Sequence, residues 1–419
     1  MSEQQNIVVI GGGISGLTTA VEAAEAGYSV TIIEKEPFLG GRVSRMNKYF
    51  PKLCPPTCGL EINYRRIKFN PRVTFHTMSE VESIKGRPGN YDVTINTRPR
   101  HVNDKCTGCN ACTEACPVEV PNDLNAGLDK RKAAYVPHEQ VFPFQYVIDK
   151  SACSGDCGTK CKEACKYDAV DMDMKPESTV LKAGSIVLAT GWKPYDASKI
   201  DNLGFGTNPN IITNVVMERI ASGNGPTGGK ITRPSDGKEV KKVAFVQCAG
   251  SRDENHLAYC SAVCCLATLK QATYVREQYP DSEAYMFYID IRTPGTSYEN
   301  FLNKIKEDEN VKLIKGKVAK VESDPSGDVI VVAEDIYGGG KIKVQVDMCV
   351  LATGMEPTIS EMKLPSDIKI NENGFMVPGK DQKGIYAVGC VKDPVDVAKS
   401  VQGATGAALK AIQTVGRIA

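Results

Sequence analysis

The distribution of apolar residues predicts a nucleotide-binding unit at the start of the chain. Ile7-Val8-Val9-Ile10 is an unbroken apolar run that leads into a glycine-rich turn. Leu17–Ala26 then has the alanine-rich pattern of a packed helix ending at Gly27, and Val30–Ile33 is a second apolar run. Strand, turn, helix and strand in this order predict a βαβ unit with parallel strands.

A second unit of this kind is predicted later in the chain. Lys242–Val246 has the pattern of a buried strand, Cys265–Tyr279 that of a helix, and Ala284–Ile291 that of a second strand. Ser185–Gly191 and Met348–Gly354 each combine an apolar strand with the tripeptide Ala-Thr-Gly. We therefore expect an α/β fold with two dinucleotide-binding, Rossmann-like units.

Composition narrows the class of protein. Among 419 residues, 51 lysines and arginines stand against 50 acids, a balance that does not favour nucleic acid or an anionic membrane as a partner. We expect no leader peptide and no membrane span, because no stretch approaches about 18 apolar residues. Sixteen cysteines in a chain of this kind indicate metal or redox chemistry rather than disulfides. We expect a cytoplasmic protein whose only association with a membrane is through partner subunits.

The first glycine turn fits a dinucleotide. Gly11, Gly13 and Gly16 supply the pattern G-x-G-x-x-G, for the tight turn, the approach of the pyrophosphate and the packing of helix on strand, respectively. Ile14 and Ser15 open the helix, whose free N–H groups and dipole favour phosphate. Glu34, followed by Lys35, ends the second strand and is expected to accept hydrogen bonds from a ribose hydroxyl. A purely structural glycine turn is the alternative.

Several later segments resemble those of flavin oxidoreductases and favour FAD over NAD. Gly41 and Arg42 belong to a double-glycine extension of the fingerprint, and Gly384–Gly389 resembles the strand that approaches the flavin ribityl chain. An aspartate usually follows that strand, whereas this chain has Cys390. The resemblance implies that Val401-Gln402-Gly403 opens a last helix with its N–H groups directed at the flavin ring. It also implies further FAD-binding residues, which are Thr190, Gly191, Gly354 and Gly389.

The segment Lys105–Pro117 carries the strongest motif in the chain. Its four cysteines follow the pattern C-x2-C-x2-C-x3-C-P of bacterial ferredoxins, and they are Cys106, Cys109, Cys112 and Cys116. The alternatives are a zinc knuckle or disulfides. A less regular quartet with three x3 spacings follows, made of Cys153, Cys157, Cys161 and Cys165.

The two quartets together resemble a two-cluster ferredoxin module inserted in the flavin domain. In such modules the last cysteine of each run binds the other cluster. One [4Fe–4S] cluster would then use Cys106, Cys109, Cys112 and Cys165, and the other Cys116, Cys153, Cys157 and Cys161. For the second quartet the alternative is a loop whose cysteines bind nothing.

The turn of the second βαβ unit has lost its glycines. Gln247–Arg252 retains only Gly250, so a pyrophosphate is poorly accommodated there. Cysteines occur instead, at Cys248, Cys260, Cys264 and Cys265. We infer that a pyridine-nucleotide site has become a cluster site whose thiolates lie at a helix N-terminus. The alternative is that these are small buried residues that pack the turn.

Gln247–Asp253 and Tyr259–Cys265 resemble the signature of the A subunits of heterodisulfide reductases. The resemblance covers nearly the whole chain and implies that Cys248, Cys260, Cys264 and Cys265 hold an unusual cluster close to the FAD. It supports an order of flavin domain, ferredoxin insert and altered second domain. The expected boundaries are 1–100, 176–235 and 351–419 for the FAD-binding domain, 101–175 for the insert and 236–350 for the second domain.

The short form of the chain and the segment Asn47–Leu60 resemble QmoA, the flavin subunit of the quinone-interacting membrane-bound oxidoreductase complex. This resemblance implies electron transfer between a quinone pool and adenylylsulfate reductase, with QmoB-like and QmoC-like subunits as partners. The alternatives are a soluble, heterodisulfide-reductase-like flavin subunit, with or without electron bifurcation, and an NAD(P)H-dependent flavin disulfide reductase. A scaffold with a structural FAD is a further rival.

Cys54 and Cys58 follow the double glycine at a different spacing from that of known redox disulfides. They are a candidate redox pair, with a partner-interface ligand or a structural pair as alternatives.

Overall fold

The computed structural model describes residues 6–153, 157–363, 365, 368–379 and 384–417. These residues form two compact units, and the chain passes between them more than once. Unit 1 comprises 1–44, 57–192 and 357–419, and unit 2 comprises 45–56 and 193–356. Two of the four boundaries fall inside short paired strands, β12 (Trp192–Pro194) and β21 (Met355–Pro357).

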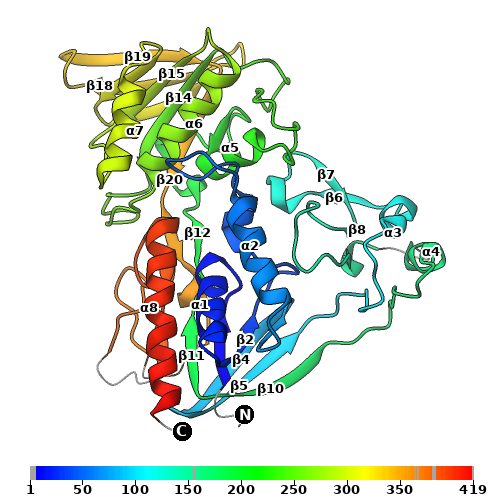
Figure 1. Ribbon diagram of the computed structural model, residues 1–419. Coiled ribbons are helices and arrows are strands. Elements are labelled where there is room, and N and C mark those ends of the chain that lie inside the picture. The colour runs from blue at the N-terminus through cyan, green and yellow to red at the C-terminus, as the bar shows by residue number, and fades with distance from the viewer. Residues whose placement is uncertain (1–5, 154–156, 364, 366–367, 380–383, 418–419) are drawn as a thin grey trace. The chain divides into compact units, whose positions relative to one another are not determined.

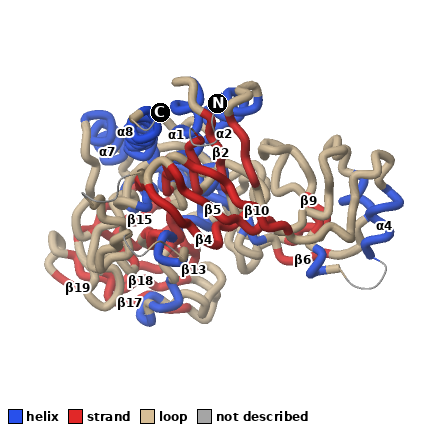
Figure 2. The backbone as a smooth tube through the Cα atoms, turned by 90° about the horizontal axis from the view of Figure 1, so that it is seen from below, coloured by secondary structure: helices blue, strands red, loops and turns tan. Residues whose placement is uncertain are grey.

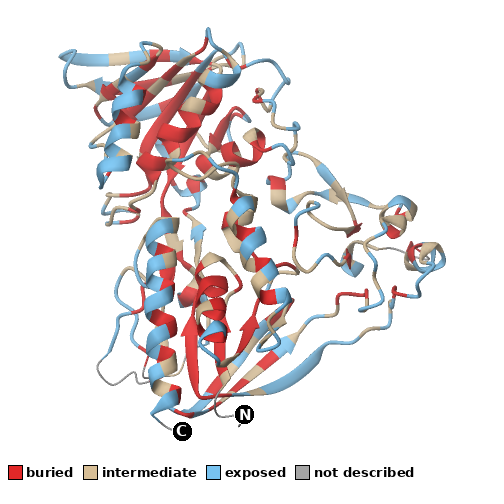
Figure 3. Cartoon of the chain, in the orientation of Figure 1, coloured by how far each residue is buried: buried red, intermediate tan, exposed pale blue. Residues whose placement is uncertain are grey.

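Unit 1 is built on a five-stranded parallel sheet in the order β22-β11-β1-β2-β3. Helices α1 and α8 pack against each other and against this sheet, as Figure 1 shows. The strands are β1 (Asn6–Ile10), β2 (Ser29–Ile33), β3 (Val73–His76), β11 (Ser185–Leu188) and β22 (Ile385–Ala387), and the helices are α1 (Ile14–Glu25), α2 (Pro56–Lys68) and α8 (Val397–Gly416). The unbroken apolar runs are explained by this position, because strands of a covered parallel sheet are buried on both faces (Figure 3).

A three-stranded antiparallel sheet completes the flavin-type unit, and the cysteine-rich insert leaves from it. Its strands are β4 (Ser79–Arg87), β5 (Asn90–Thr97) and β10 (Glu177–Ala183). Thr97 at the end of β5 pairs with Glu177 at the start of β10. The insert therefore leaves and rejoins the sheet at one end of a strand pair, which explains how a module can be added without disturbing the sheet (Figure 2).

The insert is poor in regular structure. Its elements are α3 (Ala111–Ala115), β6 (Glu119–Pro121), β7 (Lys130–Lys132), β8 (Ala134–Tyr135), β9 (Val147–Ile148) and α4 (Cys157–Ala164). Its small core combines cysteines with alanine, valine and only a few larger side chains. A core of this composition gains little from hydrophobic burial, which is typical of modules held together by a bound metal centre.

Unit 2 repeats the plan of unit 1. A parallel sheet in the order β13-β20-β14-β15-β16 is accompanied by an antiparallel sheet in the order β17-β18-β19. The parallel strands are β13 (Ile211–Thr213), β14 (Lys242–Ala249), β15 (Glu283–Tyr288), β16 (Val311–Lys315) and β20 (Met348–Thr353); the antiparallel ones are β17 (Val318–Ser323), β18 (Val329–Asp335) and β19 (Gly340–Val346); the helices are α5 (Asn214–Ala221), α6 (Cys264–Gln278) and α7 (Thr296–Lys306). The segment β14–α6–β15 thus corresponds to β1–α1–β2.

The expected domain boundaries need correction at three places. Residues 193–235 and 351–356 were expected in the flavin domain but belong to unit 2, as does the segment 45–56. The reason is pairing: β13 hydrogen-bonds to β20, and so 193–235 completes the second sheet. No helix among the described residues is long and apolar enough to cross a membrane.

Candidate functional site

The first glycine turn has the geometry that a dinucleotide requires. Gly11 has φ +110°, and a Cβ on it would lie 2.3 Å from the carbonyl oxygen of Ala189. A Cβ on Gly16 would lie 1.8 Å from the oxygen of Gly11, so helix and turn are in direct backbone contact. Gly13 precedes α1, and no side chain caps this helix. The N–H groups of the first turn of α1, including those of Ile14 and Ser15, are therefore available to phosphate.

The double-glycine extension lies beside this turn. Gly13 and Gly40 form an isolated parallel bridge, and a Cβ on Gly41 would lie 2.8 Å from the Cα of Gly13. Arg42 donates from Nε to the carbonyl oxygen of Trp192 at 2.7 Å, and its guanidinium lies 4.7 Å from the centre of the Trp192 ring. The two glycine segments were recognised separately in the sequence, and the structure brings them into contact.

Glu34 lies where the fingerprint places its acid, but its carboxylate already has partners. Oε2 accepts from the N–H of Gly12 at 2.7 Å, and Oε1 accepts from the N–H of Glu36 at 2.8 Å. Burial raises the pKa of this carboxyl, and the two N–H groups oppose the rise. Glu34 therefore fixes the shape of the turn, and its contact with a ribose hydroxyl stays a prediction. The backbone of Lys35, which follows it, accepts from Arg98 Nη2 at 2.8 Å.

Other predicted flavin residues gather around the same turn. Gly389, with φ +64°, is so close to Ser15 that a Cβ would lie 2.3 Å from the hydroxyl oxygen of Ser15. The adjoining Cys390 is buried, which raises the pKa of its thiol to about 11. Gly191 follows β11 with φ +76°, and the hydroxyl of the neighbouring Thr190 is buried without a hydrogen-bond partner. These residues fit the edge of a ligand site.

Two predictions about this site need correction. Helix α8 begins at Val397, where Asp396 Oδ1 accepts from the N–H of Lys399 at 2.8 Å. Val401, Gln402 and Gly403 thus lie in the second turn, where N–H groups bond to carbonyls one turn back rather than to a ligand. Gly354 belongs to unit 2, where a Cβ would lie 2.2 Å from Ser251 Oγ, because β20 pairs with β14 rather than with the first sheet.

The ferredoxin-like insert brings one predicted quartet to a common hollow. Cys106, Cys109, Cys112 and Cys165 all line it, together with Tyr146 and Tyr167 among others. The loop is shaped by left-handed backbone at Gly108 (φ +74°) and Asn110 (φ +68°). The N–H of Ala169 donates to Cys165 Sγ at 3.3 Å. Cys165 thus lies with the first three cysteines of the other run, and the exchange of the fourth ligand between the two clusters stays a prediction.

The other quartet gathers next to the first. Cys116 and Cys161 are buried in the core of the insert, with Cys153 packed against them. Burial raises the pKa of Cys161 to about 12, and the neighbouring sulfurs of Cys116, Cys112, Cys157 and Cys153 add to the rise. Burial also raises the pKa of Cys153 to about 12, with a hydrogen bond from its thiol to Cys157 contributing. These thiols are thus mutually close, although their spacing in the sequence is irregular.

The arrangement of the cysteines distinguishes the alternatives for the insert. All sixteen cysteines are free, so no disulfide staples the chain. Within the described residues no three Cys, His, Asp or Glu side chains are placed to hold a single metal ion. A cubane needs ligands further apart, because each sulfur binds a different iron. Buried thiols with raised pKa values suit such a centre, whose iron supplies the positive charge that favours thiolate.

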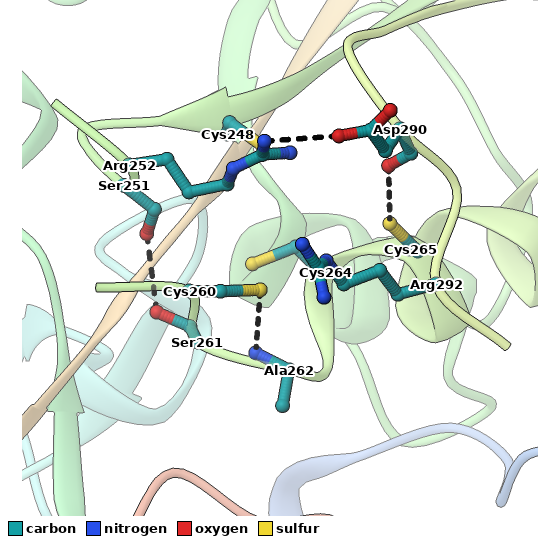
Figure 4. A pocket seen from close by; sticks show the side chains of 10 residues that line it. All are labelled: Cys248, Ser251, Arg252, Cys260, Ser261, Ala262, Cys264, Cys265, Asp290 and Arg292. Carbon is teal, nitrogen blue, oxygen red and sulfur yellow. Dashed lines mark hydrogen bonds and ion pairs between the residues drawn. The ribbon is translucent and has the colours of Figure 1, made fainter. Parts of the chain in front are cut away.

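The four cysteines of unit 2 also line one hollow, as Figure 4 shows. Cys264 and Cys265 occupy the first turn of α6, which has no side-chain cap. Cys248 comes from the end of β14, and Cys260 comes from the loop between β14 and α6. Burial raises the pKa of the Cys248 thiol. It also raises the pKa of Cys265 to about 11 and that of Cys264 well above its ordinary value.

This hollow occupies the position that a pyrophosphate would take in unit 2, since β14–α6–β15 corresponds to β1–α1–β2. Cys248 (φ +56°), Arg252 (φ +57°) and Ala262 (φ +61°) adopt left-handed backbone within one loop. Such conformations cost non-glycine residues about 1–2 kcal/mol each and tend to occur at functional sites. Ser261 Oγ holds the loop by contacting Ser251 Oγ at 3.1 Å and accepting from the N–H of Met355 at 2.9 Å.

Three charged residues of this hollow were missed in the sequence, and Arg292 is one of them. Arg252 and Asp290 both line it and form an ion pair at 2.9 Å. The sequence did carry a clue to Asp290, because an acid that follows the second strand of a βαβ unit, as Glu34 does in unit 1, faces the ligand side of the turn.

Cys54 and Cys58 are both exposed and free. Cys58 lies in the first turn of α2, whereas Cys54 belongs to unit 2. Their role as a redox pair stays a prediction.

Comparison with known proteins adds two domain assignments and a set of relatives. The family described as FAD dependent oxidoreductase matches residues 6–58, and the 4Fe-4S binding domain family matches residues 99–122. The iron–sulfur A subunit of the CoB–CoM heterodisulfide reductase of Methanocaldococcus jannaschii is 38% identical over 420 residues, which cover 96% of this chain and 63% of that protein. The chain is a homologue of these heterodisulfide reductase A subunits. Its cofactors are FAD and iron–sulfur clusters.

Other heterodisulfide reductase A subunits match over the same region. That of the ferredoxin/F(420)H(2)-dependent CoB–CoM heterodisulfide reductase of Methanosarcina acetivorans is 38% identical over 425 residues, 98% of this chain and 53% of that protein. That of the H(2):CoB-CoM heterodisulfide,ferredoxin reductase of Methanothermobacter thermautotrophicus is 35% identical over 423 residues, 98% of this chain and 64% of that protein. The chain thus spans between about half and two thirds of the length of these relatives.

Solved structures confirm the predicted fold. Thioredoxin reductase of T. acidophilum superposes with a TM-score of 0.54 at 15% identity, covering 99% of this chain and 100% of that one. Bacillithiol disulfide reductase of Bacillus cereus gives 0.52 at 11% identity, covering 99% of both chains. The flavin disulfide reductase architecture is therefore shared, with the ferredoxin-like module added.

Proposed function

We propose that the chain is the FAD- and iron–sulfur-containing electron-transfer subunit of a complex of the heterodisulfide reductase type. The observation that carries this proposal is the hollow at the start of α6. Four cysteines line it at the position where a second dinucleotide would bind in a flavin disulfide reductase. A site for NAD(P)H has thus been exchanged for a site for a cluster.

The residues divide the work between two kinds of cofactor. The turn Gly11–Gly16 and the uncapped N-terminus of α1 would hold the pyrophosphate of FAD. The eight cysteines of the insert and the four that line the hollow of unit 2 would hold [4Fe–4S] clusters in three groups of four. When bound, FAD exchanges two electrons and each cluster one, which suits a protein that passes electrons between two-electron and one-electron partners. The protein positions these groups and tunes their potentials through burial and hydrogen bonds.

Partners are proposed by similarity to the relatives, which are named as subunits of CoB–CoM heterodisulfide reductases. This chain would likewise receive or deliver electrons within a complex. A second candidate is a quinone-linked complex with QmoB-like and QmoC-like subunits and adenylylsulfate reductase, located at the membrane through those partners. It is supported by the resemblance of Asn47–Leu60 to the corresponding flavin subunit.

The test is the cofactor content of anaerobically purified protein, followed by EPR after reduction with dithionite. We expect one FAD and about twelve irons per chain, four for each cluster, and no rapid bleaching of the flavin by NADH. A count of about eight irons in both the wild type and Cys264→Ser would show that unit 2 holds no cluster. Rapid bleaching by NADH would favour an NAD(P)H-dependent disulfide reductase instead. Reduction of the purified complex by a quinol, rather than electron delivery to a heterodisulfide, would favour the second candidate.

A further inference from the structure

The hollow of unit 2 contains a positive charge that no step above has used. Arg252 and Asp290 line it with the four cysteines, and Figure 4 shows the guanidinium of Arg252 between Cys248 and the carboxylate of Asp290. Arg252 Nη2 lies 2.9 Å from Asp290 Oδ2. The side chains are 26% and 50% exposed, so the pair lies at the mouth of the hollow rather than in free solution.

The loop is built so that Arg252 and Cys248 meet. Both residues have left-handed backbone, and the N–H of Ser251 between them donates to the carbonyl of Cys248 at 3.1 Å. The N–H of Arg252 donates to the carbonyl of Tyr259, also at 3.1 Å. These bonds hold two unfavourable conformations. Glycine would adopt them at little cost, and so the side chains at these two positions are themselves the useful feature.

Arg252 also lies beside Cys248. Its guanidinium is placed between Cys248 and the carboxylate of Asp290, and both residues line the hollow (Figure 4). Cys248 is thus the proposed ligand of this quartet that has a charged side chain beside it. The sulfur of Cys260 has a backbone donor instead, the N–H of Ala262 at 3.4 Å.

We propose that Arg252, oriented by Asp290, sets the reduction potential of the cluster in unit 2 through its positive charge beside the ligand Cys248. The proposal rests on the proposed function, since it requires that cluster. Adding one electron to a thiolate-bound cluster adds negative charge, and a fixed positive charge beside a ligand sulfur stabilises the reduced form. Arg252 is accordingly a positioning and tuning residue that raises the potential of this cluster.

The experiment is a potentiometric titration of the anaerobic full-length protein with dithionite, monitored by EPR. Cys264→Ser identifies the resonance of the unit 2 cluster by removing it. In Arg252→Gln we expect wild-type FAD and iron content, while the oxidised-to-reduced equilibrium of this cluster moves at least tenfold toward the oxidised form. For one electron that is a fall of about 59 mV in potential. Arg252→Lys keeps the charge without the planar fork and should recover more than half of the fall.

Two further arginines serve as controls. Arg276 pairs with Asp308 at 2.8 Å, with exposures of 14% and 32%, near the other end of α6. It lies about 18 Å along the helix from Cys264 at 1.5 Å per residue, so Arg276→Gln should leave the potential unchanged. The exposed Arg292 lines the same hollow. Arg292→Gln should shift the potential less than Arg252→Gln does.

Three results would overturn the proposal. The first is an unchanged potential in Arg252→Gln with full iron content. The second is a shift in Arg292→Gln equal to that in Arg252→Gln, which would mean that any positive charge near the cluster has the same effect. The third is loss of the cluster in both Arg252→Gln and Arg252→Lys, which would make the residue structural. Failure of the proposed function looks different, because Cys264→Ser would then remove no iron and no resonance from the protein.

Discussion

Gly13 and Gly16, three residues apart in the first turn, should respond to the same substitution in opposite ways. A Cβ on Gly16 would lie 1.8 Å from the carbonyl oxygen of Gly11, and real Cβ contacts essentially never fall below 3.0 Å. The obstacle is backbone, which cannot rotate away. Gly13 has φ −76°, and a Cβ there would lie 3.8 Å from Gly41 Cα, an ordinary contact.

These distances give the expected magnitudes. Gly16→Ala forces helix and turn apart, an overpacking cost of about 3 kcal/mol or more. For a unit of this size the melting temperature should fall by roughly 6–12 °C. Gly13→Ala changes an N-cap residue and should cost about 1 kcal/mol or less. Its methyl group would nevertheless lie in front of the helix N-terminus, where the pyrophosphate approaches, and we expect FAD affinity to fall at least tenfold, about 1.4 kcal/mol.

Thermal unfolding of the FAD-free protein and titration with FAD measure the two effects separately. Gly406→Ala in α8 is the matched control, because its Cβ would meet nothing within 4 Å. This variant should bind FAD normally and gain up to about 1 kcal/mol of helix stability. A melting temperature of Gly16→Ala equal to that of wild type would refute the steric argument. Wild-type FAD affinity in Gly13→Ala would refute the placement of the pyrophosphate.

Three further predictions follow from other parts of the structure. Cys165→Ser should alter the EPR resonance of the cluster bound by Cys106, Cys109 and Cys112, and Cys116→Ser should alter that of the neighbouring cluster. Cys349→Ala is the control and should keep all the iron, because Cys349 is buried away from both hollows. If each variant altered the other cluster instead, the exchange of the fourth ligand would be wrong. Burial raises the pKa of Glu34 in the folded state, so its contribution to stability is present below the ordinary pKa of 4.5 and is lost as pH rises through the folded value. Urea unfolding of FAD-free protein should therefore show wild type losing stability relative to Glu34→Gln between pH 4.5 and 8, and parallel pH profiles would disprove this. Ser261→Ala leaves the buried N–H of Met355 without its acceptor, and unfolding should become easier by about 1–3 kcal/mol; a change below about 0.5 kcal/mol would show that another group replaces the hydroxyl.

The sequence by itself determined the βαβ units and the classes of cofactor. Gly11, Gly13 and Gly16 could be assigned separate roles because each role depends on local backbone geometry. The ferredoxin run Cys106–Cys116 likewise follows from spacing, since a short loop leaves few ways to bring four sulfurs together. The strand patterns predicted β1 and β2 to within one residue and the start of β14, which runs three residues further than expected, because burial on both faces leaves an unbroken apolar run.

Only the tertiary structure decided which distant segments belong together. Residues 193–235 carry no pattern that assigns them to one sheet or the other, and the pairing of β13 with β20 placed them in unit 2. Helix α8 begins at Val397 because the side chain of Asp396 caps its N-terminus. The sequence pattern around Gly403 had instead predicted that the helix begins later. Arg252 and Asp290 lie 38 residues apart and meet only because β14 and β15 end side by side. Spacing along a chain fixes local geometry, whereas long-range contacts depend on how the sheets pair and pack.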